Sequence, residues 1–454
     1  MTASDPPPSP GLDPPVETLR SAPYGRIWQL SWPTILSNLT VPMLGAVDTA
    51  VMGHLPDPAY LGGVAVGSMI FTFLYWGFGF LRMGTTGFVA QANGRDDGTE
   101  MRAVLARALL IGIAAALVLL AAQVPLRAGA LQIVDGAADV ETLARAYFDI
   151  RIWGAPATLA NYAILGWMLG MQFARAALLI QIVINGLNAA LDIWFVVELG
   201  WGIEGVALAT ALAQYTGAAL GLLLIALRLR RIEGAWVRAR IFDLAALGSL
   251  FRVSRDIFIR TLAMIFAWSL LTWSSARLGT NVLAANALLM NFQAFLSHGL
   301  DGFAHATSAL VGEAVGARNR RLLRSTVFAA TFMAGCVAVG YALVYAVFGF
   351  QLLGTLTDIP SLLSFAREFL PWMALSPLLS VWSYQLDGIF IGATRAAEMR
   401  NAMLVSVAVY TAAVFILPSF MGNHGLWASV MLFMVLRAIT LAIFYPRVLA
   451  MVAK

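Results

Sequence analysis

The chain alternates long apolar runs with short polar connections along most of its 454 residues. A helix needs about 20 predominantly apolar residues to cross the hydrocarbon core of a bilayer. The pattern therefore predicts an all-α polytopic membrane protein with about twelve transmembrane helices. The predicted ranges are 27–53, 59–90, 103–124, 142–170, 177–199, 203–227, 253–277, 281–313, 326–350, 363–392, 401–420 and 425–448.

The second half of the chain repeats the first. LGGVAVGSMIFTFLYWGFGFLRMGTTGFVAQANG begins at Leu61, and LAANALLMNFQAFLSHGLDGFAHATSALVGEAVG begins at Leu283. The offset is 283 − 61 = 222 residues, and it pairs Gly94 with Gly316 without a gap. Six helices followed by six related helices give both halves the same orientation, which is the parallel-repeat arrangement of transporters.

These patterns divide the chain into four segments. We expect a disordered cytoplasmic tail at 1–22, an N-lobe at 23–228 with helices 1–6, a basic cytoplasmic linker at 229–250, and a C-lobe at 251–454 with helices 7–12 and a short C-terminus. The tail is rich in proline and lacks an apolar core, so it does not resemble a signal peptide.

Arginine placement predicts the orientation. The connection after the first run has no arginine. The connection after the sixth run is rich in arginine and contains Arg228, Arg230, Arg231, Arg238 and Arg240. Because basic connections stay on the cytoplasmic side, both termini are predicted to be cytoplasmic. Only one of the 29 basic residues is lysine, which suggests a GC-rich bacterial genome and so a bacterial inner membrane.

Composition excludes several classes of protein. Hydrophobic residues make up 60% of the chain and charged residues 12%, against roughly 25% in soluble domains. A single cysteine, Cys336, excludes an internal disulfide or a cysteine metal cluster, and the four histidines lack ligand spacing. We therefore expect no enzyme, cofactor or firm metal site. The net charge of +5 reflects orientation rather than nucleic-acid binding, and we expect a monomer in the lipid bilayer.

Four polar residues form a stripe within the fifth apolar run. Gln181, Asn185, Asn188 and Asp192 fall at i, i+4, i+7 and i+11, which places them on one helical face. A carboxylate in a membrane helix costs roughly 2.5–3.5 kcal/mol on insertion scales, so this face should avoid lipid. Two interpretations remain open: polar contacts that hold helices together, or a site for an ion or proton.

Depth along the helices predicts which polar residues meet. At 1.5 Å per residue, Asp48 lies about 27 Å and Asp192 about 22 Å above the cytoplasmic edge. Asn188 lies about 16 Å up, and Thr210 about 12 Å below the outer edge. These four side chains are therefore expected to converge in the N-lobe.

The C-lobe is expected to lack this set, since the 222-residue shift places Leu270 opposite Asp48. We thus expect buried carboxylates at matched depth in the N-lobe alone. Asn38 shares a face with Asp48 on the first helix, and Gln181 and Asn185 continue the polar stripe, so these three are candidates to line a cavity. Tyr147 and Arg151 either line that cavity as well, or Arg151 neutralises a carboxylate.

The motifs WPTIL, DTAVMGHL, NAALD and GVALAT resemble those of the multidrug and toxic compound extrusion (MATE) transporters, and LDGFAHATSALVGEAVGARN resembles their DinF branch. The resemblance implies two six-helix lobes around a central cleft and export of amphipathic, often cationic compounds in exchange for protons or sodium. It implies that Asp48, Asn188, Asp192 and Thr210 are the coupling residues, and it matches Tyr147 to a family tyrosine.

The sequence thus predicts a secondary active exporter that works by alternating access. A proton is favoured as the coupling ion, because sodium would need about five or six oxygen ligands, whereas a proton needs one carboxylate with a partner. Sodium coupling stays open, since the same residues supply suitable oxygens. A flippase for lipid-linked glycans is the other alternative, although its cleft would carry several basic residues for a pyrophosphate.

Overall fold

The computed structural model describes residues 23–452 apart from 54–56 and 135, with side chains outside the description at 41–50, 53 and 58. The N-lobe helices are α1 (Tyr24–Gly53), α2 (Pro58–Trp76), α3 (Phe80–Gly94), α4 (Gly98–Ala121), α5 (Gln123–Val134), α6 (Ala138–Arg151), α7 (Ala155–Gly170), α8 (Ala174–Asp192) and α9 (Gly202–Leu229). The second half comprises α10 (Arg238–Ile241), α11 (Leu244–Leu278), α12 (Thr280–Gly316), α13 (Arg320–Gly354), α14 (Pro360–Arg367), α15 (Leu370–Gly392), α16 (Ala396–Ile416), α17 (Pro418–Ala442) and α18 (Tyr445–Ala450).

The all-helical fold is confirmed, and each predicted run coincides with one helix or with consecutive helices. Eight helical segments within the described part of the chain are long and apolar enough to cross a membrane. Two runs are interrupted by 3₁₀ turns: the turn at Gly77–Gly79 separates α2 from α3, and the turn at Ile152–Gly154 separates α6 from α7. α5 was not predicted, because its 12 residues are too short to span the membrane and all but its first two lie outside the predicted runs.

The repeat is visible in the backbone. Asp96, Gln172, Arg318 and Thr394 have φ between 51° and 57°, the left-handed conformation that closes a helix end. They form two pairs separated by 318 − 96 = 222 and 394 − 172 = 222 residues, which is the offset found in the sequence. These residues lie in the turns 95–97, 171–173, 317–319 and 393–395, and we call the end of the bundle that carries them the basal end.

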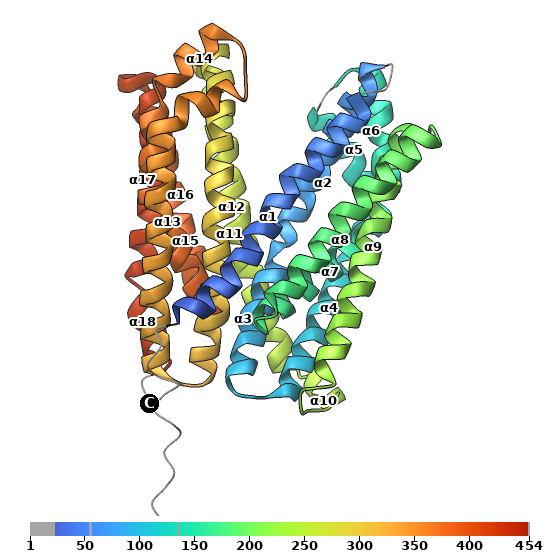
Figure 1. Ribbon diagram of the computed structural model, residues 1–454, viewed down its shortest axis with the longest axis vertical. Helices are drawn as coiled ribbons and strands as arrows, with labels where there is room; N and C mark the ends of the chain where they lie inside the picture. Colours follow the sequence, from blue (N-terminus) through green and yellow to red (C-terminus); the bar gives the residue numbers. More distant parts are fainter. Residues whose placement is uncertain (1–22, 54–56, 135, 453–454) are drawn as a thin grey trace, which may run out of the picture.

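The two lobes meet at the basal end. There α3 packs against α12, with further contacts to α11 and α15 of the C-lobe. The ribbons of the two halves approach one another toward the end labelled α10 and diverge toward the end labelled α14 and α6 (Figure 1).

The first helix packs in both lobes. α1 runs along α12 of the C-lobe and along α8 of the N-lobe. Its basal residues Ile27 and Leu30 are buried in a cluster with Leu296, Leu300 and Phe303 of α12. A single helix therefore connects the C-lobe core to the helix that bears the polar stripe.

The arginine-rich connection packs at the basal end. Arg102 of α4 donates to the carbonyl oxygens of Leu229 and Ile232, both at 2.8 Å. Arg240 of α10 lies 3.6 Å from Asp97 in the α3–α4 turn. The connection between the lobes is thus tied to the N-lobe at its base.

Candidate functional site

The polar stripe of α8 leads into the N-lobe core. Asn188 and Asp192 are completely buried, with 0% of their surfaces exposed. The Asn188 amide nitrogen donates to the Asp192 carboxylate at 2.9 Å and reaches the Thr210 hydroxyl of α9 at 3.5 Å. Spacing of one helical turn brings Asn188 and Asp192 together, and the packing of α8 on α9 adds Thr210. The structure therefore groups three of the four predicted coupling residues.

The helix changes its winding directly after the carboxylate. Residues Ile193–Glu198 form a π-helix that continues α8. Such segments widen the helix, weaken its regular hydrogen-bond ladder and occur often at functional sites. Phe195 of this segment stacks on Trp201 with ring centroids 4.9 Å apart, which anchors the widened turn to the start of α9. Asp192 thus sits at a junction between two helical forms.

The side chain of Asp48, the fourth predicted coupling residue, lies outside the described part of the structure. Its helix is placed, since α1 packs along both α8 and the π-helical segment. A meeting of Asp48 with Asp192 stays a prediction.

The basal half of the stripe makes contacts between helices. Gln181 donates to Asn185 at 3.0 Å, and Asn185 donates to the Thr40 hydroxyl of α1 at 2.7 Å. Asn38 of α1 donates to the backbone oxygen of His298 in α12 at 3.4 Å. These residues connect α8 to α1 and α1 to the C-lobe, so the basal half of the stripe holds helices together.

Tyr147 and Arg151 lie apart from the stripe, on α6. Tyr147 is 3% exposed and packs near Phe71 of α2, with ring centroids 6.1 Å apart. The Arg151 guanidinium lies over the rings of Phe71 and Tyr75, 5.4 and 5.3 Å from their centroids. Because aromatic faces attract a cation, these two rings stabilise the buried Arg151 guanidinium.

Comparison with known proteins places this architecture. The MatE family model matches residues 33–194 and 257–417, which is most of both lobes. The chain belongs to the MATE family.

The MATE chain is similar to DNA damage-inducible protein F of Escherichia coli (strain K12), with 41% identity over 93% of this chain and 92% of that protein. It is 27% identical to a probable multidrug resistance protein NorM of Rhizobium meliloti (strain 1021), over 72% of this chain and 73% of the relative. A solved outward-facing multidrug resistance MATE transporter shares the fold, with a TM-score of 0.83 over 97% of this chain and 98% of that one, at 20% identity.

Family membership fixes the broad class. The protein is a multi-pass membrane protein and a secondary transporter of the multidrug efflux type, acting on small molecules, and it is not an enzyme. No cluster of three potential His, Cys, Asp or Glu metal ligands occurs among the described residues.

The C-lobe of this MATE transporter holds a buried ionic cluster that was not predicted from the sequence. Asp387 of α15 is 7% exposed and accepts hydrogen bonds from Arg260 of α11 and from Arg437 of α17, the latter at 2.7 Å. Arg437 also lies over the rings of Tyr384 and Phe433. The C-lobe therefore buries a carboxylate of its own, which was not anticipated from the sequence.

This C-lobe cluster was detectable in principle. Its three charged members fall in the predicted spans 253–277, 363–392 and 425–448, where a charge is costly and signals a partner. Leu270, which the repeat places opposite Asp48, is indeed apolar and packs in the C-lobe core. The C-lobe carboxylate thus occupies a different position from the N-lobe set, on α15 rather than on the counterparts of α1 and α8.

Proposed function

We propose that this MATE transporter exports amphipathic cationic compounds in exchange for protons, by alternating access between its two lobes. Asp48, Asn188, Asp192 and Thr210 form the coupling site in this proposal. The observation that carries it is the completely buried carboxylate of Asp192, bonded to an equally buried amide inside a membrane helix. A carboxylate in that setting is costly unless it has a function or a fixed partner.

The hydrogen bonds of Asn188 support a proton rather than sodium. Asn188 directs its amide nitrogen at both Asp192 and Thr210. A sodium ion between these side chains would need the amide oxygen in that place, because hard cations bind oxygen. An amide N–H instead suits a carboxylate that gains and loses a proton, since it can bond the second oxygen in either state.

Orientation completes the proposal. We infer that the basal end faces the cytoplasm of a bacterial inner membrane, because the arginine-rich connection between α9 and α11 lies there. A cysteine at Ala235, in a Cys336→Ala background, should react with a membrane-impermeant maleimide only after permeabilisation. Labelling from outside intact cells would reverse the assignment.

The coupling ion can be tested in proteoliposomes with an amphipathic cationic dye such as ethidium. An imposed pH gradient should drive dye movement, and an imposed sodium gradient should not. Asp48→Asn should abolish the proton-driven transport with normal expression. The matched control is Leu270→Met, at the repeat position, which should transport as the wild type does. Transport driven by sodium alone would overturn the proton assignment.

A further inference from the structure

The two lobes touch through a pair of symmetric glycine contacts. A methyl group added at Gly94 of α3 would lie 2.1 Å from the backbone oxygen of Glu313 in α12. A methyl group added at Gly316 of α12 would lie 2.1 Å from the backbone oxygen of Gln91 in α3. These residues are repeat mates, since 316 − 94 = 222 and 313 − 91 = 222. The crossing of α3 and α12 therefore follows a pseudo-two-fold axis, with backbones in direct contact.

The side chains at this crossing obey the same symmetry. Gln91 of the N-lobe donates to Gly392 O at 2.9 Å and to the Thr394 hydroxyl at 3.2 Å, both in the C-lobe. Glu313 of the C-lobe accepts a 2.7 Å bond from the Gln172 amide in the N-lobe. Thr394 and Gln172 are also 222 residues apart. Gln91 of the N-lobe thus reaches the end of α15 and the turn that follows it. Glu313 of the C-lobe reaches the turn after α7, which is the equivalent position in the repeat.

Only one of these two contacts is charged. Arg26, in the first turn of α1, donates to Glu313 at 2.6 Å and to the Gln172 oxygen at 2.8 Å. The repeat position, 26 + 222 = 248, is Gly248, which has no side chain to offer. Each of the three residues Arg26, Gln172 and Glu313 is therefore hydrogen-bonded to the other two, across the interface between the lobes. We call these three residues the basal latch.

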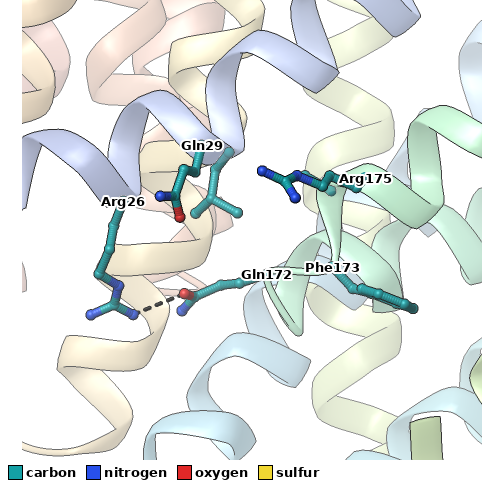
Figure 2. Close-up of a pocket in the computed structure, with 7 residues that line it drawn as sticks. Arg26, Gln29, Gln172, Phe173 and Arg175 are labelled. Atoms are coloured by element: carbon teal, nitrogen blue, oxygen red, sulfur yellow. Dashed lines mark hydrogen bonds between the residues drawn. The ribbon is translucent and has the colours of Figure 1, made fainter.

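The basal latch borders a cavity of about 200 Å³. Figure 2 shows Arg26 extending from α1 toward Gln172, with Gln29 and Arg175 farther along the cavity. The side chains of Arg26 and Glu313 are 46% and 21% exposed, so water reaches the ion pair. An exposed pair of this kind is weak and is screened by salt. A contact that must break and re-form in every transport cycle needs that property.

We propose that Arg26 and Glu313 are gate residues that hold the basal end closed in this conformation and separate when the lobes open there. The inference rests on the alternating-access mechanism proposed above. Because Arg26 is on α1, which also carries Asp48, the latch joins the basal gate to the helix proposed to respond to protonation. The neutral contact of Gln91 keeps the lobes in register while the charged contact sets how readily they part.

The gate can be tested on the full-length protein without substrate. Arg95 and Ala317 are exposed repeat mates in the two basal turns, so spin labels at Arg95→Cys and Ala317→Cys, in a Cys336→Ala background, report the distance between the lobes. Wild type should show mainly the short distance. Arg26→Gln and Glu313→Gln should each raise the ratio of long to short distances by about fivefold, as expected for loss of about 1 kcal/mol.

The matched control is Arg175→Gln. Arg175 lines the same cavity and carries the same charge, but it forms no hydrogen bond or ion pair with a described residue. It should leave the distances unchanged, and the exchanged pair Arg26→Glu with Glu313→Arg should restore the short distance. Equal effects of Arg26→Gln and Arg175→Gln, or no effect of Glu313→Gln in protein that elutes as the wild type does, would overturn the gate.

The outcome is separable from that of the proposed function. The distances are measured without ion gradients or dye, so they can contradict the gate while proton-driven export stands. If instead the distances respond as expected and the wild type fails to move dye under any gradient, the proposed exporter activity fails and the latch remains.

Discussion

Each lobe buries a carboxylate among its spanning helices, and the two accept described hydrogen bonds from different kinds of donor. Asp192 in the N-lobe accepts a hydrogen bond from an amide, whereas Asp387 in the C-lobe accepts hydrogen bonds from two guanidinium groups. Arginine carries a permanent charge, so the C-lobe cluster balances Asp387 with fixed cations. The comparison teaches that burial of a carboxylate does not by itself indicate a coupling site, because its partners decide what protonation can change.

The positions of the two carboxylates reinforce this contrast. Asp192 ends the regular part of α8, where the helix passes into a π-helix. Asp387 lies within α15 and joins it to α11 and α17, three helices of one lobe. We therefore expect Asp192 to affect transport and Asp387 to affect the stability of the C-lobe.

The largest expected effect is on transport by Asp192→Asn. Removing the titratable group should lower proton-driven dye export by at least about tenfold, in the range of typical coupling energies. The shape of the side chain is kept, so the thermal melting temperature in detergent should stay near that of the wild type. If Asp192→Asn transports normally, Asp192 has a structural role as Asp387 does, and the proposed difference between the two carboxylates is wrong.

The second effect is on stability, by Asp387→Asn. This change leaves two buried guanidinium groups without their counter-charge, which should cost about 3–5 kcal/mol of folding free energy. The melting temperature monitored by intrinsic tryptophan fluorescence should drop strongly. Arg260→Gln should lower it less, since Arg437 still pairs with Asp387. A melting curve like that of the wild type, combined with lost proton coupling, would assign Asp387 to the coupling site instead.

The smallest effect is expected from Thr210→Val. The hydroxyl donates to Val206 O within its own helix, and from the described residues it receives a long 3.5 Å contact from Asn188. Loss of one such contact should reduce transport about twofold to fivefold, the equivalent of roughly 0.5–1 kcal/mol. Thr216→Val is the matched control, because it removes a similar helix-internal hydroxyl bond on an exposed part of α9. Equal losses from the two variants would remove Thr210 from the site.

Much of the fold was predictable because lipid imposes a simple rule: every spanning segment must be helical and apolar. The 222-residue repeat could be found in the sequence because close helix crossings demand glycine, as at Gly94 and Gly316. The interruptions at Gly77–Gly79 and Ile152–Gly154 could not, because a 3₁₀ turn inside an apolar run leaves the hydrophobic pattern unchanged.

The candidate site divides in the same way. Helical spacing and depth brought together Asn188, Asp192 and Thr210, which lie on consecutive helices. The C-lobe cluster depends on contacts across 127 and 50 residues of sequence, and the order of α11, α15 and α17 in space is set by tertiary packing. Depth along single helices carries no information about which helices are neighbours.

The shared helix α1 also constrains how the protein is made. Ile27 and Leu30 leave the ribosome long before Leu296, Leu300 and Phe303, on which they pack. At typical synthesis rates the ribosome needs on the order of tens of seconds to reach those partners. During that interval the basal face of α1 must be covered by lipid, by the insertion machinery or by a temporary neighbour. α1 therefore reaches its final packing only after α12 has been made.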